Sequence, residues 1–212
     1  MTGTNRCHWC DSRLASGEGL DSKFSHVDGQ VCRECVAAPR IALVGCGSSK
    51  IALDDGETVA AKDLYDSPYF SLKREFAETC CDKWMILSAE HGLISPDEEI
   101  GAYDASLKPS SNSYIGDYEA GKWSVNTSNE IRVFDSFQAV YASYVVLAGE
   151  DYVRHIEDEL ASGHRRVSFP FRSDDLGGIG DQQGWLREQI DSYHPPDRAD
   201  LDHYGAVGGE SA

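Results

Sequence analysis

A lysine, a thiol and two serine hydroxyls follow a short apolar run near residue 45, and they are the first candidates for chemistry. The run is Ile41–Val44, and the residues after it read Gly-Cys-Gly-Ser-Ser-Lys, ending at Lys50. Glycines permit backbone torsions that other residues avoid, so this turn can present its polar groups closely. A lysine amine placed there can act as a nucleophile or hold an anionic substrate. The spacing from glycine to lysine differs from that of a Walker A phosphate loop.

A second group of polar residues follows the apolar run Trp84–Leu87. The group consists of Ser88, Glu90, His91, Tyr103 and Asp104. A histidine can transfer a proton near neutral pH, and a carboxylate can orient the histidine or the substrate. We therefore assign Lys50, His91 and Asp104 as the candidate catalytic residues.

A third turn, Ala148–Tyr152, follows another apolar run at Tyr144–Leu147. In open α/β sheets, ligands bind beyond the carboxyl ends of the strands. If the three runs are parallel strands, their turns surround one cleft at the same edge of the sheet. The candidate substrate-binding residues are Cys46, Gly47, Ser48, Ser88, Glu90, Tyr103, Gly149 and Tyr152.

Helices that alternate with these strands must place the three turns. One helix is predicted to begin at Ser67-Pro68, a second near Ser128, a third after Tyr152, and a fourth carries Trp185 to Tyr193. Residues 166–171 are predicted as a fourth strand, and residues 110–126 as an irregular polar insertion. This alternation predicts an α/β fold over residues 39–193, a three-layer Rossmann-like domain with a mostly parallel sheet. Residues 194–212 are predicted to be a flexible acidic tail.

The first 38 residues carry two cysteine pairs, Cys7-x2-Cys10 and Cys32-x2-Cys35, separated by 21 residues. This spacing is typical of a four-cysteine zinc ribbon, in which each pair gives two thiolates to one tetrahedral Zn²⁺. Alternating residues around Asp28-Gly29 predict a hairpin with a two-residue turn that brings the second pair beside the first. A zinc ion with four protein ligands is structural, so the predicted role of the module is to bind a partner protein or nucleic acid.

The composition is strongly acidic, with 36 Asp and Glu residues against 19 Lys and Arg residues and a net charge of -17. Only seven of the basic residues are lysines. Such a surface indicates adaptation to high salt, where mutual repulsion is screened; the alternative is an acidic face that binds a partner. Counterion release contributes little at molar salt, so low basicity does not exclude a nucleic-acid substrate.

No stretch of the sequence approaches the roughly 20 apolar residues of a membrane span. The first six residues are polar and lack the apolar core of a signal peptide. We therefore expect a cytoplasmic protein that does not enter a membrane, with cysteines that are reduced or bound to metal.

The ordered motifs of residues 40–192 resemble the uncharacterised family known as domain of unknown function 6884, common in haloarchaea. The motifs are Cys46-Gly-Ser-Ser-Lys50, Leu64-Tyr65-x-Ser67-x2-Phe70, Ile86-Leu-Ser-Ala-Glu-His91-Gly92-Leu93, Tyr103-Asp104, Ala148-Gly149-x2-Tyr152 and Gly178-x-Gly180-x4-Trp185-Leu186. More distantly, Ser-Ser-Lys50 and Gly92-Leu-Ile-Ser-Pro96 are similar to the core domain of archaeosine synthase, which modifies a deazaguanine base in transfer RNA. The chain lacks that enzyme's proline after the lysine and its RNA-binding appendage. The resemblance implies chemistry on a nucleobase or nucleotide.

Two functions follow from these observations. In the first, the chain is an enzyme acting on a nucleotide or nucleobase, either free or within nucleic acid, by group transfer or hydrolysis. Lys50 is then the nucleophile or the anchor of the substrate, His91 moves a proton, and the serines donate hydrogen bonds. In the second, the chain is a non-catalytic module in which the α/β domain senses a nucleotide and the zinc ribbon recruits a partner.

Overall fold

The computed structural model describes residues 6–7, 13–15, 20–21, 30–32, 38–136, 142–162, 166–174 and 176–193. The chain separates into two compact units. The larger unit is Pro39–Asp191, and the other comprises Met1–Ala38 together with Ser192–Ala212.

The centre of the larger unit is strand β3, Arg40–Gly45, in which all six residues are buried. It pairs in parallel with β5 (Lys83–Ser88) on one side and with β8 (Ser143–Leu147) on the other. Apolar, β-branched residues suit a strand that is covered on both faces, which explains why the run at 41–44 occupies this position. The predicted parallel strands at 41–44, 84–88 and 144–147 are therefore confirmed.

Two short strands complete a five-stranded sheet with the order β6-β5-β3-β8-β9. Strand β6 (Gly92–Ile94) folds back antiparallel on β5, and β9 (Arg166–Ser168) pairs in parallel with β8. The sequence predicted a longer fourth strand at 166–171, but a 3-10 turn, η1 (Pro170–Arg172), replaces its second half. Pro170 explains this end, because proline lacks the N–H that the next ladder bond requires.

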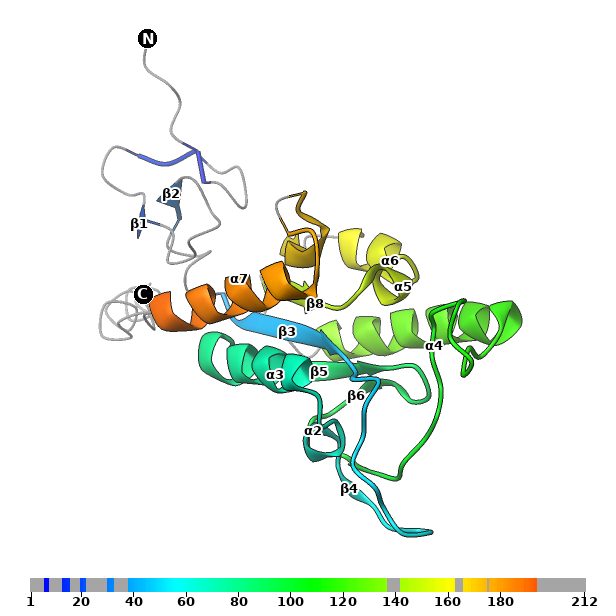
Figure 1. The fold of residues 1–212 in the computed structure, drawn as a ribbon. Helices are drawn as coiled ribbons and strands as arrows, with labels where there is room; N and C mark the ends of the chain where they lie inside the picture. Colours follow the sequence, from blue (N-terminus) through cyan, green and yellow to red (C-terminus); the bar gives the residue numbers. More distant parts are fainter. Residues whose placement is uncertain are drawn as a thin grey trace, which may run out of the picture. The chain divides into compact units, whose positions relative to one another are not determined.

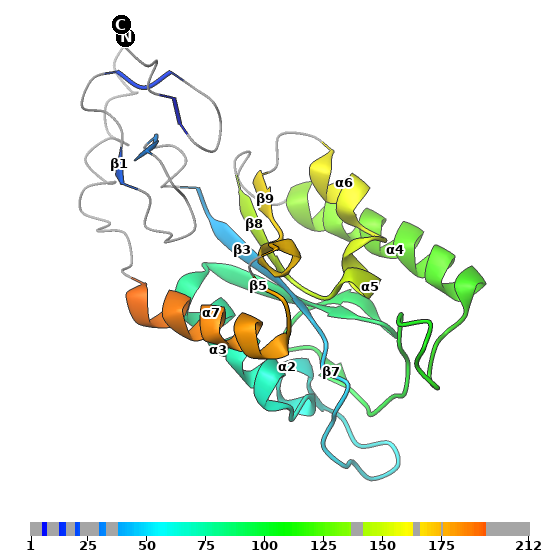
Figure 2. The same ribbon diagram turned by 45° about the horizontal axis from the view of Figure 1, so that its top comes forward.

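Helices cover both faces of the sheet (Figures 1 and 2). Helices α4 (Asp117–Ser136), α5 (Glu150–Val153) and α6 (Glu157–Ala161) lie on one face. Helices α3 (Pro68–Cys80) and α7 (Ile179–Ser192) lie on the other and touch through Phe76 and Trp185, whose ring centroids are 5.6 Å apart. Side chains of a strand point alternately to the two faces, so Ile41 and Leu43 join the core beneath α4–α6.

Helix α3 begins where the sequence predicts. Ser67 is the N-cap, and its hydroxyl accepts the Phe70 N–H at 3.1 Å, while Pro68 occupies the first helical position. The apolar face carries Cys80, which is buried and forms no disulfide.

Two predictions for the helices on the α4–α6 face of the sheet were wrong. Helix α4 begins at Asp117, eleven residues before the predicted start at Ser128, so most of the expected irregular insertion is helical. The single helix expected after Tyr152 is two short helices, α5 and α6, separated by Arg154–Ile156. In α4 the extra turns carry few apolar residues, and only Ala120, Trp123 and Thr127 are buried before Ile131.

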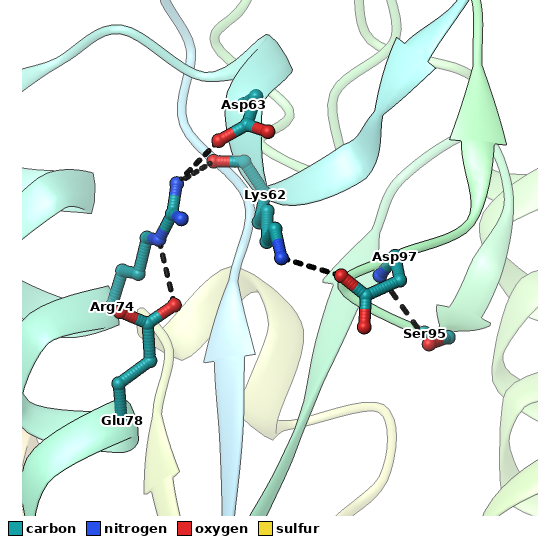
Figure 3. A network of polar contacts seen from close by, with 6 residues as sticks. All are labelled: Lys62, Asp63, Arg74, Glu78, Ser95 and Asp97. Atoms are coloured by element: carbon teal, nitrogen blue, oxygen red, sulfur yellow. Dashed lines mark hydrogen bonds and ion pairs between the residues drawn. The ribbon is translucent and has the colours of Figure 1, made fainter.

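A small antiparallel pair, β4 (Val59–Ala60) with β7 (Glu99–Ile100), adjoins helix α2 (Ala61–Leu64). One ion pair connects this region to α3, and another lies within the region (Figure 3). The Arg74 guanidinium contacts Asp63 at 2.7 Å and Glu78 at 2.8 Å, and Lys62 pairs with Asp97. These side chains are partly or fully exposed, so water screens each pair and its contribution to stability is small; their effect is mainly to neutralise acidic groups.

In the smaller unit, strand β1 (Leu20–Asp21) pairs antiparallel with β2 (Gln30–Val31). Gln30 and Val31 belong to the second half of the predicted hairpin, but its turn at Asp28-Gly29 lies outside the described residues, so the two-residue hairpin stays a prediction. Residues 22–29, Cys10, Cys35 and the predicted tail 194–212 lie outside the described residues.

Within the described residues, no helix combines the length and the apolar character that crossing a membrane requires.

Candidate functional site

The carboxyl ends of β3, β5 and β8 lie at the same edge of the sheet, because the three strands are parallel. Near this edge Val44 of β3 pairs with Ile86 of β5 and with Leu147 of β8. From β3 the chain passes through α3 to β5 on one side, while β8 lies on the other side. Such a reversal of strand order is where open α/β sheets bind ligands. Cys46 follows β3 directly, and its N–H donates to the Leu87 carbonyl at 3.0 Å, which fixes the turn to the neighbouring strand.

Tyr103 is the residue on which the candidate catalytic groups meet. The Lys50 ammonium lies 4.2 Å from the centroid of the Tyr103 ring and 5.9 Å from that of Tyr65. The His91 ring contacts Tyr103 edge to face, with centroids 5.0 Å apart. The structure therefore brings Lys50 and His91, 41 residues apart in sequence, onto one aromatic side chain. The face of an aromatic ring attracts an ammonium group, so Tyr103 positions the Lys50 amine at the strand ends.

Ser88 holds this arrangement in place from the end of β5. Its hydroxyl donates to the Tyr103 oxygen at 2.9 Å and accepts the N–H groups of Glu90 and His91 at 3.3 and 3.1 Å. Its carbonyl accepts the indole N–H of Trp123 at 2.7 Å. The side chain is completely buried, so one serine fixes both Tyr103 and the turn that carries His91.

A second contact crosses the strand ends. The Cys46 sulfur lies 3.1 Å from the Tyr152 hydroxyl, which connects the turn after β3 to helix α5 after β8. Gly47 allows this path, because a Cβ at this position would lie 3.2 Å from the Cβ of Tyr65. Cys46 is partly exposed and forms no disulfide.

Burial raises the pKa of the three phenols around the turn. Desolvation is the largest cause for Tyr65, Tyr103 and Tyr152, and the proximity of the Cys46 thiol raises each pKa further. Tyr65 and Tyr103 also share a hydrogen bond of 2.8 Å between their oxygens. All three phenols therefore stay protonated across the physiological range and act as hydrogen-bonding groups, not as bases.

Lys73, which sequence reasoning missed, supports the turn from beneath. Its ammonium donates to the Gly45 carbonyl at 2.6 Å and lies 4.9 Å from the Tyr69 ring centroid. Burial lowers the pKa of this amine to about 8, with the nearby Cys46 opposing the change. The sequence did carry a signal, since Lys73 falls on the apolar face of α3 between Tyr69 and Phe76. Lysines are seldom fully buried, so a lysine at such a position indicates a specific role.

The other predicted site residues lie at the same edge of the sheet or close to it, but among the described residues they form no hydrogen bond with Lys50 or His91. Asp104 is exposed and, within the described chain, makes no hydrogen bond or ion pair with His91 or any other residue. Ser48 and Glu90 expose their side chains at the same edge. Gly149 is the N-cap of α5, where its carbonyl accepts the N–H of Tyr152 at 2.9 Å and of Val153 at 3.1 Å. The described residues include no group of three or more His, Cys, Asp or Glu placed to hold a metal ion.

Comparison with known proteins places the larger unit in context. Residues 41–188 match a family of unknown function designated DUF6884. The chain is also similar to the uncharacterized protein YfjM of Bacillus subtilis strain 168. The two are 28% identical over 160 residues, which cover 73% of this chain and 97% of the Bacillus protein.

Proposed function

The chain belongs to the DUF6884 family of unknown function, and we propose that it is an enzyme acting on a nucleotide or nucleobase. The reaction is group transfer or hydrolysis at the edge where β3, β5 and β8 end. The observation that carries the proposal is the meeting of Lys50 and His91 on Tyr103, at the reversal of strand order. In this proposal the sheet and its helices form a Rossmann-like domain, whose ligands bind at that edge.

The roles follow from the chemistry of each group. The Lys50 ammonium binds a phosphate or another anionic group of the substrate, or attacks an electrophilic carbon when it is deprotonated. The partly aromatic surroundings, Tyr65 and Tyr103, suit stacking against a base. His91 is exposed at the same edge and can give or take a proton. Ser88 and Tyr103 keep the histidine turn in position.

The experiment is a thermal-shift and turnover screen with free bases, nucleosides, nucleotides and short RNA, including 7-deazaguanine compounds. Lys50→Met is compared with Lys108→Met, which removes the same charge from an exposed lysine. We expect Lys50→Met to abolish turnover of the identified substrate, with a melting temperature close to that of the wild type. If both variants retain turnover, or if only Lys108→Met loses it, the proposed site is wrong.

The missing contact between Asp104 and His91 favours a second candidate, a nucleotide sensor without catalysis. A histidine with no orienting partner is a weaker general base than one held by a carboxylate. The same screen separates the candidates. A sensor gives a Lys50-dependent thermal shift with a ligand that is recovered unchanged after prolonged incubation, whereas an enzyme converts it.

For the smaller unit we propose a zinc ribbon with Cys7, Cys10, Cys32 and Cys35 as ligands, serving to bind a partner protein or nucleic acid. Among the described residues, the Cys32 N–H lies 3.3 Å from the buried Cys7 sulfur, and such N–H groups stabilise a metal-bound thiolate. The residue types suit Zn²⁺, which four thiolates hold tetrahedrally. Elemental analysis of protein purified without chelators should give about one zinc per chain, and Cys7→Ser with Cys32→Ser should remove it. Zinc-free wild-type protein would refute the ribbon.

A further inference from the structure

A cleft of about 320 Å³ lies beside the histidine turn, between the turn after β5 and helix α4. It is lined mainly by polar side chains from these two elements. Glu90 and His91 line it from the turn, and Glu119, Trp123, Thr127 and Glu130 line it from α4. Its volume is sufficient for a small organic molecule.

The lining is rich in hydrogen-bond acceptors and carries a negative charge. Three carboxylates, from Glu90, Glu119 and Glu130, border the cleft. Lys122, the lysine among the described lining residues, is already paired with Glu119 at 2.9 Å. A Glu130 oxygen accepts the Leu93 N–H at 2.8 Å, which leaves its other oxygen for a ligand. An anion would be repelled here, whereas a cation with several N–H donors finds matching acceptors.

Thr127 supplies an independent sign of a missing ligand. The residue is completely buried, it lines the cleft, and its hydroxyl has no hydrogen-bond partner among the described residues. A buried hydroxyl without a partner is unfavourable, because it has lost its hydrogen bonds to water and gained none in return. The hydroxyl lies below the accessible surface of the lining, so a ligand donor would satisfy it once a neighbouring side chain shifts.

The geometry distinguishes an organic cation from a metal ion. The acidic groups of the cleft are spread along about three turns of α4 and the facing turn. Among the described residues, no three His, Cys, Asp or Glu are close enough together to ligate one metal. The side chains of Trp123 and Ile115 add apolar wall to the cleft. Separated charges with apolar surface between them suit an alkyl chain that carries amine or guanidinium groups.

We propose that this cleft binds a small organic cation, an alkyl diamine or a guanidinium compound, with the carboxylates and the Thr127 hydroxyl as acceptors. The inference goes beyond the proposed function and does not depend on it, because the cation binds without a nucleotide.

Calorimetric titration of the full chain tests the proposal at one fixed potassium chloride concentration. The probes are putrescine, agmatine, uncharged 1,4-butanediol of matching length, and magnesium chloride. The diamine or the guanidinium compound should bind at least about tenfold more tightly than the diol. No binding of either cation, equal binding of diol and diamine, or tighter binding of magnesium would overturn the proposal.

Variants of residues outside the Lys50 site locate the binding. Glu119→Gln should weaken the binding of the cation about tenfold, because it removes one carboxylate and leaves Lys122 unpaired, whereas Glu75→Gln on α3 should have no effect. Thr127→Val should weaken binding several-fold while the ligand-free protein melts at the same or a higher temperature, since the valine has no hydroxyl to satisfy. Unchanged affinity in both cleft variants would place the bound cation elsewhere.

Discussion

The buried lysine beneath the turn makes the stability of the larger unit depend on pH in a defined direction. In the unfolded chain the Lys73 amine titrates near 10.5, and in the folded chain its pKa is about 8 because burial disfavours the ammonium. Between these values the unfolded state binds more protons than the folded state. The free energy of unfolding therefore rises with pH between about 8 and 10.5. Below about pH 8 the folded state carries the full cost of burying the Lys73 ammonium.

The magnitude follows from the difference between the two pKa values. At about 1.36 kcal/mol per pH unit, the folded state gains about 3 kcal/mol over the whole window. About 2 kcal/mol of this gain falls between pH of about 7.5 and about 9.5. Higher pH is unsuitable, because Tyr65 and Tyr103 have pKa values raised by burial and their ionisation in the unfolded chain lowers stability above about pH 10.

The assay is urea unfolding at several pH values and constant potassium chloride, for the wild type, Lys73→Met and Lys108→Met. The free energy of unfolding of the wild type, minus that of Lys73→Met, should rise by about 2 kcal/mol across the window. Lys108 is exposed, so the same subtraction with Lys108→Met should stay flat. Parallel pH profiles for the wild type and Lys73→Met would show that the amine is not desolvated, and the account of the turn would fail.

Three further predictions concern the remaining surface and core. The melting temperature should fall as potassium chloride decreases from molar to millimolar concentration, since a net charge of -17 repels itself when unscreened; an unchanged value would contradict adaptation to salt. Gly92→Ala should lower the free energy of unfolding in urea by about 2 kcal/mol, because φ is +74° and the new Cβ would lie 2.4 Å from a Glu130 oxygen. The control Gly56→Ala has φ of +82° but open space around the new Cβ, so it should lower the same free energy by only about 1 kcal/mol. Trp123→Phe should lower the free energy of unfolding measured by calorimetry by about 3 kcal/mol, because it removes packing and the hydrogen bond to the Ser88 carbonyl. An unchanged free energy would show that this buried hydrogen bond is not formed.

The central elements could be predicted because their patterns are local. The run Ile41–Val44 is apolar at every position, and Ser67-Pro68 combines a capping hydroxyl with a residue suited to the first helical turn. The polar turns after the strands were recognisable for the same reason, and parallel pairing then placed Lys50 and His91 at one edge.

The missed features depend on partners distant in sequence. The first half of α4 buries only a narrow stripe of residues, and this half also contains Gly121. The apolar periodicity was therefore too weak to distinguish this half of the helix from a loop. Strand β6 has three residues, and its pairing with β5 is what makes it a strand. The position of Lys73 on the apolar face of α3 was visible in the sequence, but its hydrogen bond to the Gly45 carbonyl depends on how α3 packs against β3.

The hydrogen bonds of Ser88 have a consequence for the timescale on which the histidine turn moves. Glu90 and His91 expose their side chains, yet their amide protons are bound to a buried hydroxyl that also holds Tyr103. Amide hydrogen exchange at these two positions therefore requires the serine to release its partners, and we expect it to be slow for an exposed turn. A ligand that displaces Tyr103 would loosen the same hydroxyl. Exchange at residues 90 and 91 would then report occupancy of the neighbouring site in solution, without a label and without turnover.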